Sequence, residues 1–166
     1  MLGRSRSILI AGSAALSALL LSAGREVCAQ QVGTLTTTGN LDFGRFVAGA
    51  GGTVIMSPAG GKPTATGGVI VLNSPSAAAA TFSVGKSGSG KPLKTVIFSL
   101  PSNTDVRLTS NGNSMAVTNF VSAPAAGVSN SASTTSTVSV GATLNVGANQ
   151  PAGAYSGSFT VIANFQ

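Results

Sequence analysis

The chain has 166 residues, no histidine, one cysteine and three acidic residues, and its formal net charge is +6. Most catalytic and metal sites use imidazole, thiolate or paired carboxylate groups, so this composition argues against an enzyme, a metal site or a bound cofactor. The positive charge reflects the scarcity of acidic residues. A nucleic-acid-binding protein would instead carry a dense basic surface.

The first 29 residues have the pattern of a secretory signal peptide. Arg4 and Arg6 precede an uncharged apolar run over residues 8–23, and Ala29 is a small residue suited to cleavage. The run is shorter than the roughly 20 residues that cross a bilayer as a helix. We therefore expect cleavage after Ala29, no membrane span in the remaining chain, and a product in the periplasm or at the cell surface.

The predicted mature chain, 30–166, is a single secreted domain. Loss of the signal removes Cys28 and Glu26 and lowers the net charge from +6 to +4. Asp42 and Asp105 are the carboxylates that remain. No disulfide can form without cysteine, so stability has to come from burial, for which a chain of about 137 residues is long enough.

Short runs of β-branched and aromatic residues, separated by Gly, Pro, Asn and Ser clusters, predict an all-β fold. Their spacing favours a single antiparallel β-sandwich, Ig-like or pilin-like. In chain order we expect strands at 41–47, 53–57, 67–73, 79–85, 93–100 and 142–148. The strand at 67–73 is expected to be central and buried on both faces, because four consecutive residues in it are apolar. Residues 122–136 are expected to form a long loop.

Two further signals complete the expected sandwich. Asn111 and Gly112 separate two apolar-alternating runs, which favours a tight hairpin. Residues 155–165 alternate aromatic or apolar residues with polar ones, so one face of this last strand should carry all the aromatic side chains. Its candidate interaction residues are Tyr155, Phe159, Val161 and Phe165.

The loop at 85–92 has the glycine and lysine spacing of a phosphate-binding loop. Such a loop needs Ser or Thr after the lysine and a helix behind it, whereas Pro92 occupies that position and a strand pattern follows. We interpret it as a flexible turn. Asp42 and Asp105 are too far apart in the sequence to indicate a paired-carboxylate site, and a calcium site would gather more oxygen ligands.

Three segments carry a family resemblance: Leu41-Asp42-Phe43-Gly44, residues 141–146 and residues 151–161. With them the chain resembles a family of bacterial secreted domains of unknown function over nearly its whole mature length. The start and end motifs more distantly resemble spore coat U-type domains, which are pilin-like secreted proteins linked to chaperone–usher export. The chain lacks the cysteines of that group. The resemblance to the closer family implies no catalytic residues.

These observations predict a non-enzymatic secreted or cell-surface structural protein, a pilin-like subunit assembled by β-strand addition. Residues 155–165 would form the edge offered to a neighbour, and residues 31–39, with Val32 and Leu35, would be the donor segment. The partners would be copies of the chain or related subunits and a periplasmic chaperone. The alternative is a self-contained secreted binding domain for a surface glycan or envelope component, in which 31–39 pairs within its own sheet.

Overall fold

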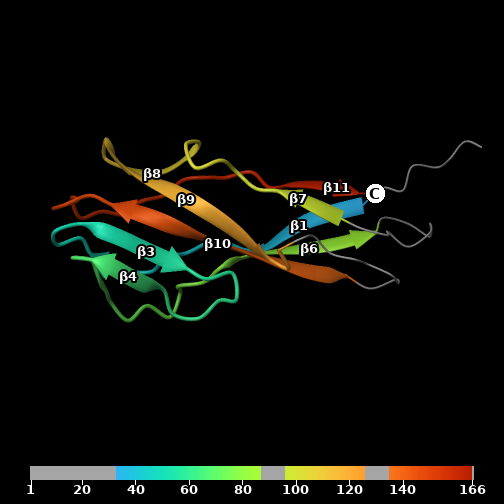
Figure 1. Ribbon diagram of the computed structural model, residues 1–166, viewed down its shortest axis with the longest axis horizontal. Helices are drawn as coiled ribbons and strands as arrows, with labels where there is room; N and C mark the ends of the chain where they lie inside the picture. The colour runs from blue at the N-terminus through green and yellow to red at the C-terminus, as the bar shows by residue number, and fades with distance from the viewer. Residues whose placement is uncertain (1–32, 87–95, 126–134, 166) are drawn as a thin grey trace, which may run out of the picture.

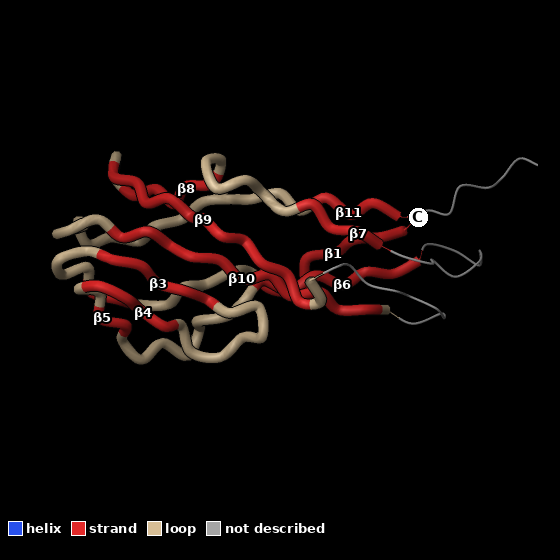
Figure 2. The backbone as a smooth tube through the Cα atoms, in the orientation of Figure 1, coloured by secondary structure: helices blue, strands red, loops and turns tan. Residues whose placement is uncertain are grey.

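The computed structural model describes residues 33–86, 96–125 and 135–165. Within these ranges the chain forms strands, loops and turns and no helix (Figures 1 and 2), so the expected all-β antiparallel fold is confirmed. The strands of the described chain are β1 (Gly33–Gly39), β2 (Phe46–Val47), β3 (Gly52–Met56), β4 (Thr64–Gly67), β5 (Ile70–Val71), β6 (Ala80–Lys86), β7 (Val96–Ser99), β8 (Val106–Ser110), β9 (Asn113–Ala123), β10 (Ser136–Val146) and β11 (Ile162–Phe165).

Strand β10 is the centre of a seven-stranded antiparallel sheet, which forms the first layer of the molecule. At one edge its first half pairs with β6 and its second half pairs with β3. At its other edge it pairs with β9. Strands β1, β4 and β8 extend the sheet beyond β6, β3 and β9 (Figure 1).

The residue pattern of β10 explains its central place. Successive side chains of a strand point to opposite faces, and here one face is apolar and the other is mostly hydroxyl-bearing. The buried apolar side chains of β10 are those of Val138, Val140, Ala142, Leu144 and Val146.

Gly141 lies where the partner of β10 changes from β6 to β3. A Cβ atom at this position would collide with the backbone of Met56 and Pro58. The absence of a side chain therefore lets the end of β3 approach β10 closely.

The second layer consists of two separate pieces. In one, β2 pairs with β5 and an isolated bridge joins Asp42 to Ala78. In the other, β7 pairs with β11, and a bridge joins Ser156 to Thr109 of β8. Apolar side chains fill the space between the layers in three clusters.

Phe159 connects two of these clusters. Its ring centroid lies 6.4 Å from that of Phe82, edge to face, and 5.2 Å from that of Phe120. Aromatic pairs favour these tilted geometries, so the second layer is anchored on the first at this point.

Several strands lie where the sequence predicts them. The strands expected at 53–57 and 79–85 are β3 and β6, each displaced by one residue. Asn111 and Gly112 have φ of +46° and +82° and join β8 to β9, which confirms the hairpin. The strand expected at 142–148 is the second half of a longer β10. Of the loop expected at 122–136, the ends belong to β9 and β10, and residues 126–134 lie outside the described residues.

The prediction of a central, buried strand at 67–73 is wrong. Strand β4 ends at Gly67, where φ is +70°, and β5 contains two residues. The side chains of Ile70 and Leu72 are 62% and 40% exposed, and Val69 is the one buried residue of the apolar run. A Cβ at Gly68 would collide with Ala50. The two glycines therefore let the chain turn and pass close to another loop. The apolar composition of residues 69–72 does not predict this turn.

The prediction of one continuous strand at 155–165 is also wrong, although the predicted alternation of inward and outward side chains is confirmed. Residues 157–161 belong to no strand, and only the bridge at Ser156 and β11 are paired. The side chains at Ser156, Ser158 and Thr160 are exposed. The predicted inward side chains are half-buried: Tyr155, Phe159, Val161 and Phe165.

The remaining expected elements are shorter than predicted or lie outside the described residues. The strand at 41–47 is reduced to a bridge at Asp42 and to β2, because Gly44, with φ of +73°, interrupts it. Residues 96–99 of the strand expected at 93–100 form β7. The signal peptide (1–29) and most of the loop at 85–92 lie outside the described residues.

Candidate functional site

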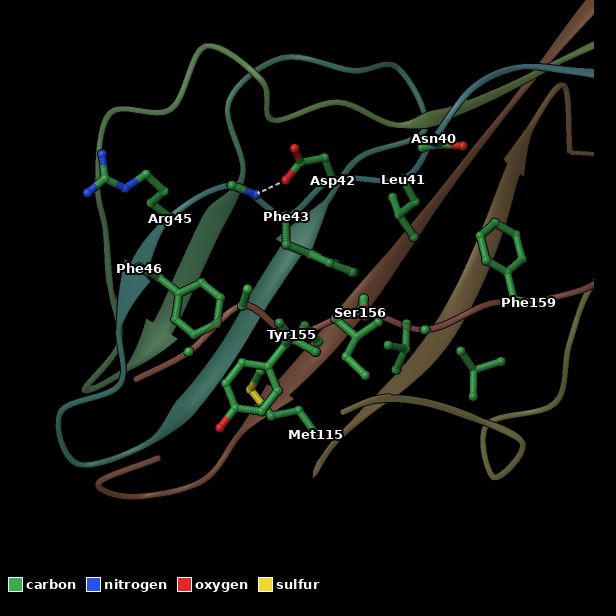
Figure 3. A pocket seen from close by; sticks show the side chains of 18 of the residues that line it. Asn40, Leu41, Asp42, Phe43, Arg45, Phe46, Met115, Tyr155, Ser156 and Phe159 are labelled. Carbon is green, nitrogen blue, oxygen red and sulfur yellow. Dashed lines mark hydrogen bonds between the residues drawn. The ribbon is translucent and has the colours of Figure 1, made fainter. Parts of the chain in front are cut away.

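An open groove of about 1050 Å³ with both polar and apolar lining residues runs between the two pieces of the second layer (Figure 3). Residues 39–48 form one wall and residues 150–159 form the other. The first layer supplies the floor. The floor side chains are those of Ala80, Phe82, Val106, Leu108, Met115, Val117, Phe120 and Leu144.

The first wall is fixed on the side that faces away from the groove. The Asp42 N–H donates to the Ala78 carbonyl oxygen at 2.8 Å, and the Ala78 N–H donates to the Asp42 carbonyl oxygen at 2.9 Å. The Gly44 N–H donates to the Asp42 carboxylate at 2.6 Å. This local turn places the Phe43 ring in the core, where it is 6% exposed.

The second wall is fixed in the same way, to β8. The Thr109 N–H donates to the Ser156 carbonyl oxygen at 2.8 Å, and the Ser156 N–H donates to the Thr109 carbonyl oxygen at 3.1 Å. A Cβ at Gly157 would collide with the carbonyl group of Arg107. The glycine therefore lets the wall approach β8 closely.

One end of the groove is closed by hydrogen bonds. The Asn149 N–H donates to the Gly49 carbonyl oxygen at 2.9 Å, which joins the two walls. Beside it, the Tyr155 hydroxyl donates to the Pro151 carbonyl oxygen at 2.8 Å and accepts a bond from the Gln150 amide at 2.9 Å. The turn that begins the second wall is therefore held in one conformation.

The two walls run in opposite directions. Gly49 lies beside Asn149 at the closed end, whereas Gly33 lies against the ring of Phe165 at the other end of the molecule. Figure 1 shows the same course, with the chain passing from β1 towards β3 and returning to β11. A strand placed in the groove would therefore be parallel to one wall and antiparallel to the other.

Both walls present unpaired backbone to the groove. In an antiparallel pair a residue exchanges both hydrogen bonds with its partner, and the next residue points its N–H and C=O groups the other way. Asp42 and Ser156 bind away from the groove, so neighbours such as Phe43 and Gly157 direct their backbone groups towards it. Among the described residues, no backbone hydrogen bond joins Phe43 or Gly157 to another residue. The second layer therefore consists of two separate two-stranded sheets, β2–β5 and β7–β11, with the groove between them.

The groove offers little charge. Asp42 and Arg45 are the charged residues that line it, and both belong to the first wall. The Arg45 carbonyl oxygen accepts a bond from the Leu72 N–H at 2.8 Å, which fixes this part of the wall to the end of β5. In the described ranges, no three His, Cys, Asp or Glu residues lie close enough together to hold a metal ion. No helix in the described part of the chain is long and apolar enough to cross a membrane.

The structure divides the residues of the predicted interaction strand. Tyr155 and Phe159 line the groove. Val161 packs against the cluster around Phe82, and Phe165 packs against the cluster around Val84, so both belong to the protein's own core.

The predicted donor segment is part of the first layer over its described length. Residues 33–39 form β1, which pairs with β6 from Gly33 opposite Lys86 to Gly39 opposite Thr81. Leu35 packs on Val84. Val32 lies outside the described residues.

Neither the floor nor the first wall carries a sequence motif that marks it as part of a site. Phe43 and Phe46 of that wall, together with Met115 on the floor, lie near Tyr155 in Figure 3. The interruption of an apolar strand pattern by Gly44 was the available signal, because a strand broken by glycine leaves backbone groups without regular partners.

A protein-family comparison identifies the domain. The family described as "Domain of unknown function (DUF4402)" matches residues 34–165, which is most of the chain. The chain belongs to the DUF4402 family. The match includes both walls and the floor of the groove, so the groove lies within the DUF4402 domain itself. Searches of curated proteins and of solved structures found no match to the chain.

Proposed function

We propose that this DUF4402 protein is a non-enzymatic secreted or cell-surface structural protein, a pilin-like subunit that assembles by β-strand addition. In this mode of recognition an extended segment adds to a sheet, main-chain hydrogen bonds provide affinity and side-chain pockets provide specificity. The observation that supports it is the groove between the two pieces of the second layer, whose walls contain Phe43 and Gly157, residues without a backbone hydrogen bond among those of the described chain.

A single added strand would remove two unfavourable features of the isolated subunit. Backbone N–H and C=O groups that are shielded from water are stable only when they are paired. Free sheet edges promote unspecific association. One extended segment would pair with Phe43 on one side and with Gly157 on the other.

The chemistry of the chain is consistent with a structural role. Histidine is absent, and Cys28 and Glu26 lie in the predicted signal peptide. The resemblance to spore coat U-type domains, which are secreted and pilin-like, suggests the same class of role. Secretion to the periplasm or cell surface, with a periplasmic chaperone and related subunits as partners, is part of the proposal.

The test compares two valine variants of the full chain in its native bacterium. Val47 lines the groove and Val121 lies outside it on β9, and each side chain is 51% exposed. Surface material would be sheared off, sedimented and examined by electron microscopy. We expect high-mass assemblies with the wild type and V121D, and loss of them with V47D. A wild-type protein that is secreted and remains monomeric in every fraction contradicts the proposal.

The second candidate is a self-contained secreted binding domain for a surface glycan or envelope component. The pairing of β1 with β6 within the same chain favours it, because the segment first expected to be a donor is already used. This candidate predicts a stable monomer that is retained on a glycan array or on isolated cell envelopes. Absence of specific retention on both would exclude it.

A further inference from the structure

We propose that the outer edge of β1 binds a second copy of the chain, so that the β1 strands of two subunits pair antiparallel about a two-fold axis. The site is an edge of the first layer and not the groove, and each subunit keeps β1 in its own sheet. The inference therefore goes beyond the proposed function, in which a segment enters the second layer.

Strand β1 is an edge strand with a single partner. It pairs with β6 from Gly33 to Gly39, and no other strand of the described chain pairs with it. A strand carries N–H and C=O groups on both of its sides, so half of those of β1 point away from β6. The register shift lies at the end of the strand, between Thr37 and Gly39, which leaves residues 33–37 as a regular edge.

The other edges of the same sheet are protected against pairing. Strand β4 has four residues and ends at Gly67, where φ is +70°. The outer edge of β8 is used by the two hydrogen bonds between Thr109 and Ser156. Where β9 extends beyond β8, Asn119 has φ of +51° and its N–H donates to the Asn103 side chain. Short length, an occupied edge and an irregular backbone all hinder association at a sheet edge.

Strand β1 lacks these protections over residues 33–37. Its sequence, Gly-Thr-Leu-Thr-Thr-Thr-Gly, contains no charged residue and no proline, which are the residues that commonly prevent pairing at an edge. A partner must itself present an unpaired strand edge of similar length and without like charges. The β1 strand of a second copy meets each of these conditions.

The side chains of β1 suit a symmetric pair. A two-fold axis perpendicular to the sheet makes the two strands antiparallel and keeps equivalent faces on the same side. With the axis near Leu35, Thr34 of each subunit lies opposite Thr36 of the other, and cross-strand threonine pairs stabilise a sheet. The two Leu35 side chains become neighbours on the inner face. Each is half-buried on Val84 of its own subunit, and the pair would cover what remains exposed.

The experiment measures the oligomeric state of the purified full-length mature protein by sedimentation velocity over a range of concentrations. The T34K/T36K variant places like charges opposite each other in the proposed pair, and T34E/T36E does so with the opposite sign. The matched control is T64K/T66K, because Thr64 and Thr66 are also exposed threonines at alternate positions of an edge strand, β4. Each protein is checked for an unchanged circular dichroism spectrum.

We expect the wild type and T64K/T66K to form dimers, and T34K/T36K and T34E/T36E each to dimerise at least about tenfold more weakly. An equimolar mixture of the two β1 variants should form dimers again, because opposite charges then face each other. Recovery in the mixture would also show that both variants are folded.

A wild type that is monomeric at every concentration would overturn the inference. Equal losses for T34K/T36K and T64K/T66K, or no recovery in the mixture, would also overturn it. A dimer that V47D abolishes and the β1 variants leave intact would place the contact at the groove, which overturns the inference and leaves the proposed function standing. A dimer that V47D retains and T34K/T36K loses supports the inference, whatever the outcome of the test of surface assembly.

Discussion

Ser156 and Thr109 exchange two backbone hydrogen bonds, of 3.1 and 2.8 Å, and so attach the second wall of the groove to β8. This isolated bridge is the only pairing of the described chain between residue 155 and β11. It determines which backbone groups of the wall are used inside the subunit. The groups of the next residue, Gly157, are left facing the groove.

Replacement of Ser156 by proline should detach this wall. Proline has no N–H, so the bond to the Thr109 carbonyl oxygen is lost. We expect a loss of about 1–2 kcal/mol in the free energy of unfolding, measured by urea denaturation. The matched control is S158P, because no backbone hydrogen bond of Ser158 occurs among the described residues. Equal losses for the two variants would show that the bridge does not hold the wall.

The hairpin between β8 and β9 should depend on its two turn residues. Gly112 has φ of +82°, a conformation that β-branched residues adopt only with strain. We expect G112V to lower the free energy of unfolding by about 1–3 kcal/mol. The control is S114V at an exposed position of β9, where valine suits the strand. A G112V protein as stable as S114V would mean that the turn can adopt another conformation.

The success of the hairpin prediction and the failure at 67–73 have one physical explanation. The geometry of an Asn-Gly turn is determined by the two residues themselves, so Asn111 and Gly112 could be interpreted without knowledge of the rest of the chain. The apolar run after Gly67 is ambiguous, because its burial depends on which elements cover it. Gly68 contacts Ala50, which belongs to a different loop, and the residues next to Gly68 in the sequence do not predict this contact.

The groove could be predicted only in part for a related reason. Alternation over 155–165 correctly indicated which side chains point inward, because this depends on strand geometry alone. Pairing depends on neighbours that are distant in sequence. The second wall meets Thr109 on one side and faces the first wall, around Phe43, across the groove. More than 100 residues separate the two walls, so the site appears only when the chain is folded.

Gly141 should tolerate no side chain. A Cβ at this position would meet the backbone of Met56 and Pro58, which cannot rotate away as a side chain could. We expect G141A to lower the free energy of unfolding by about 1–3 kcal/mol, the usual range for overpacking. In the control, G147A, the added Cβ would lie 3.1 Å from the side-chain oxygen of Gln150 and would meet no backbone atom within 4 Å, so we expect a smaller loss. Thermal and urea denaturation of both variants would test this. A stable G141A protein would mean that β3 can move away from β10 without loss.

Asp105 should give the protein a stability contribution that is lost in acid. Hydrogen bonds from the Ser102 hydroxyl, and to a lesser extent from the Thr104 hydroxyl, lower the pKa of Asp105 from its ordinary value of 3.8. A carboxyl group whose pKa is lower in the folded state stabilises that state above its unfolded pKa, and the stabilisation is lost as the pH falls through the folded pKa. The relevant window therefore lies below pH 3.8.

The two hydroxyls can be ranked by NMR titration of the Asp105 carboxyl carbon. We expect S102A to raise the pKa of Asp105 towards 3.8, and T104A to raise it less, because the Ser102 bond is the largest cause of the shift. The control is S114A, at an exposed serine on β9, which should leave the titration unchanged. The D105N variant has no carboxyl group at this position. Its free energy of unfolding should therefore fall less than that of the wild type as the pH is lowered. A larger shift in T104A than in S102A would reverse the assignment, because the bond that lowers the pKa most would then come from Thr104.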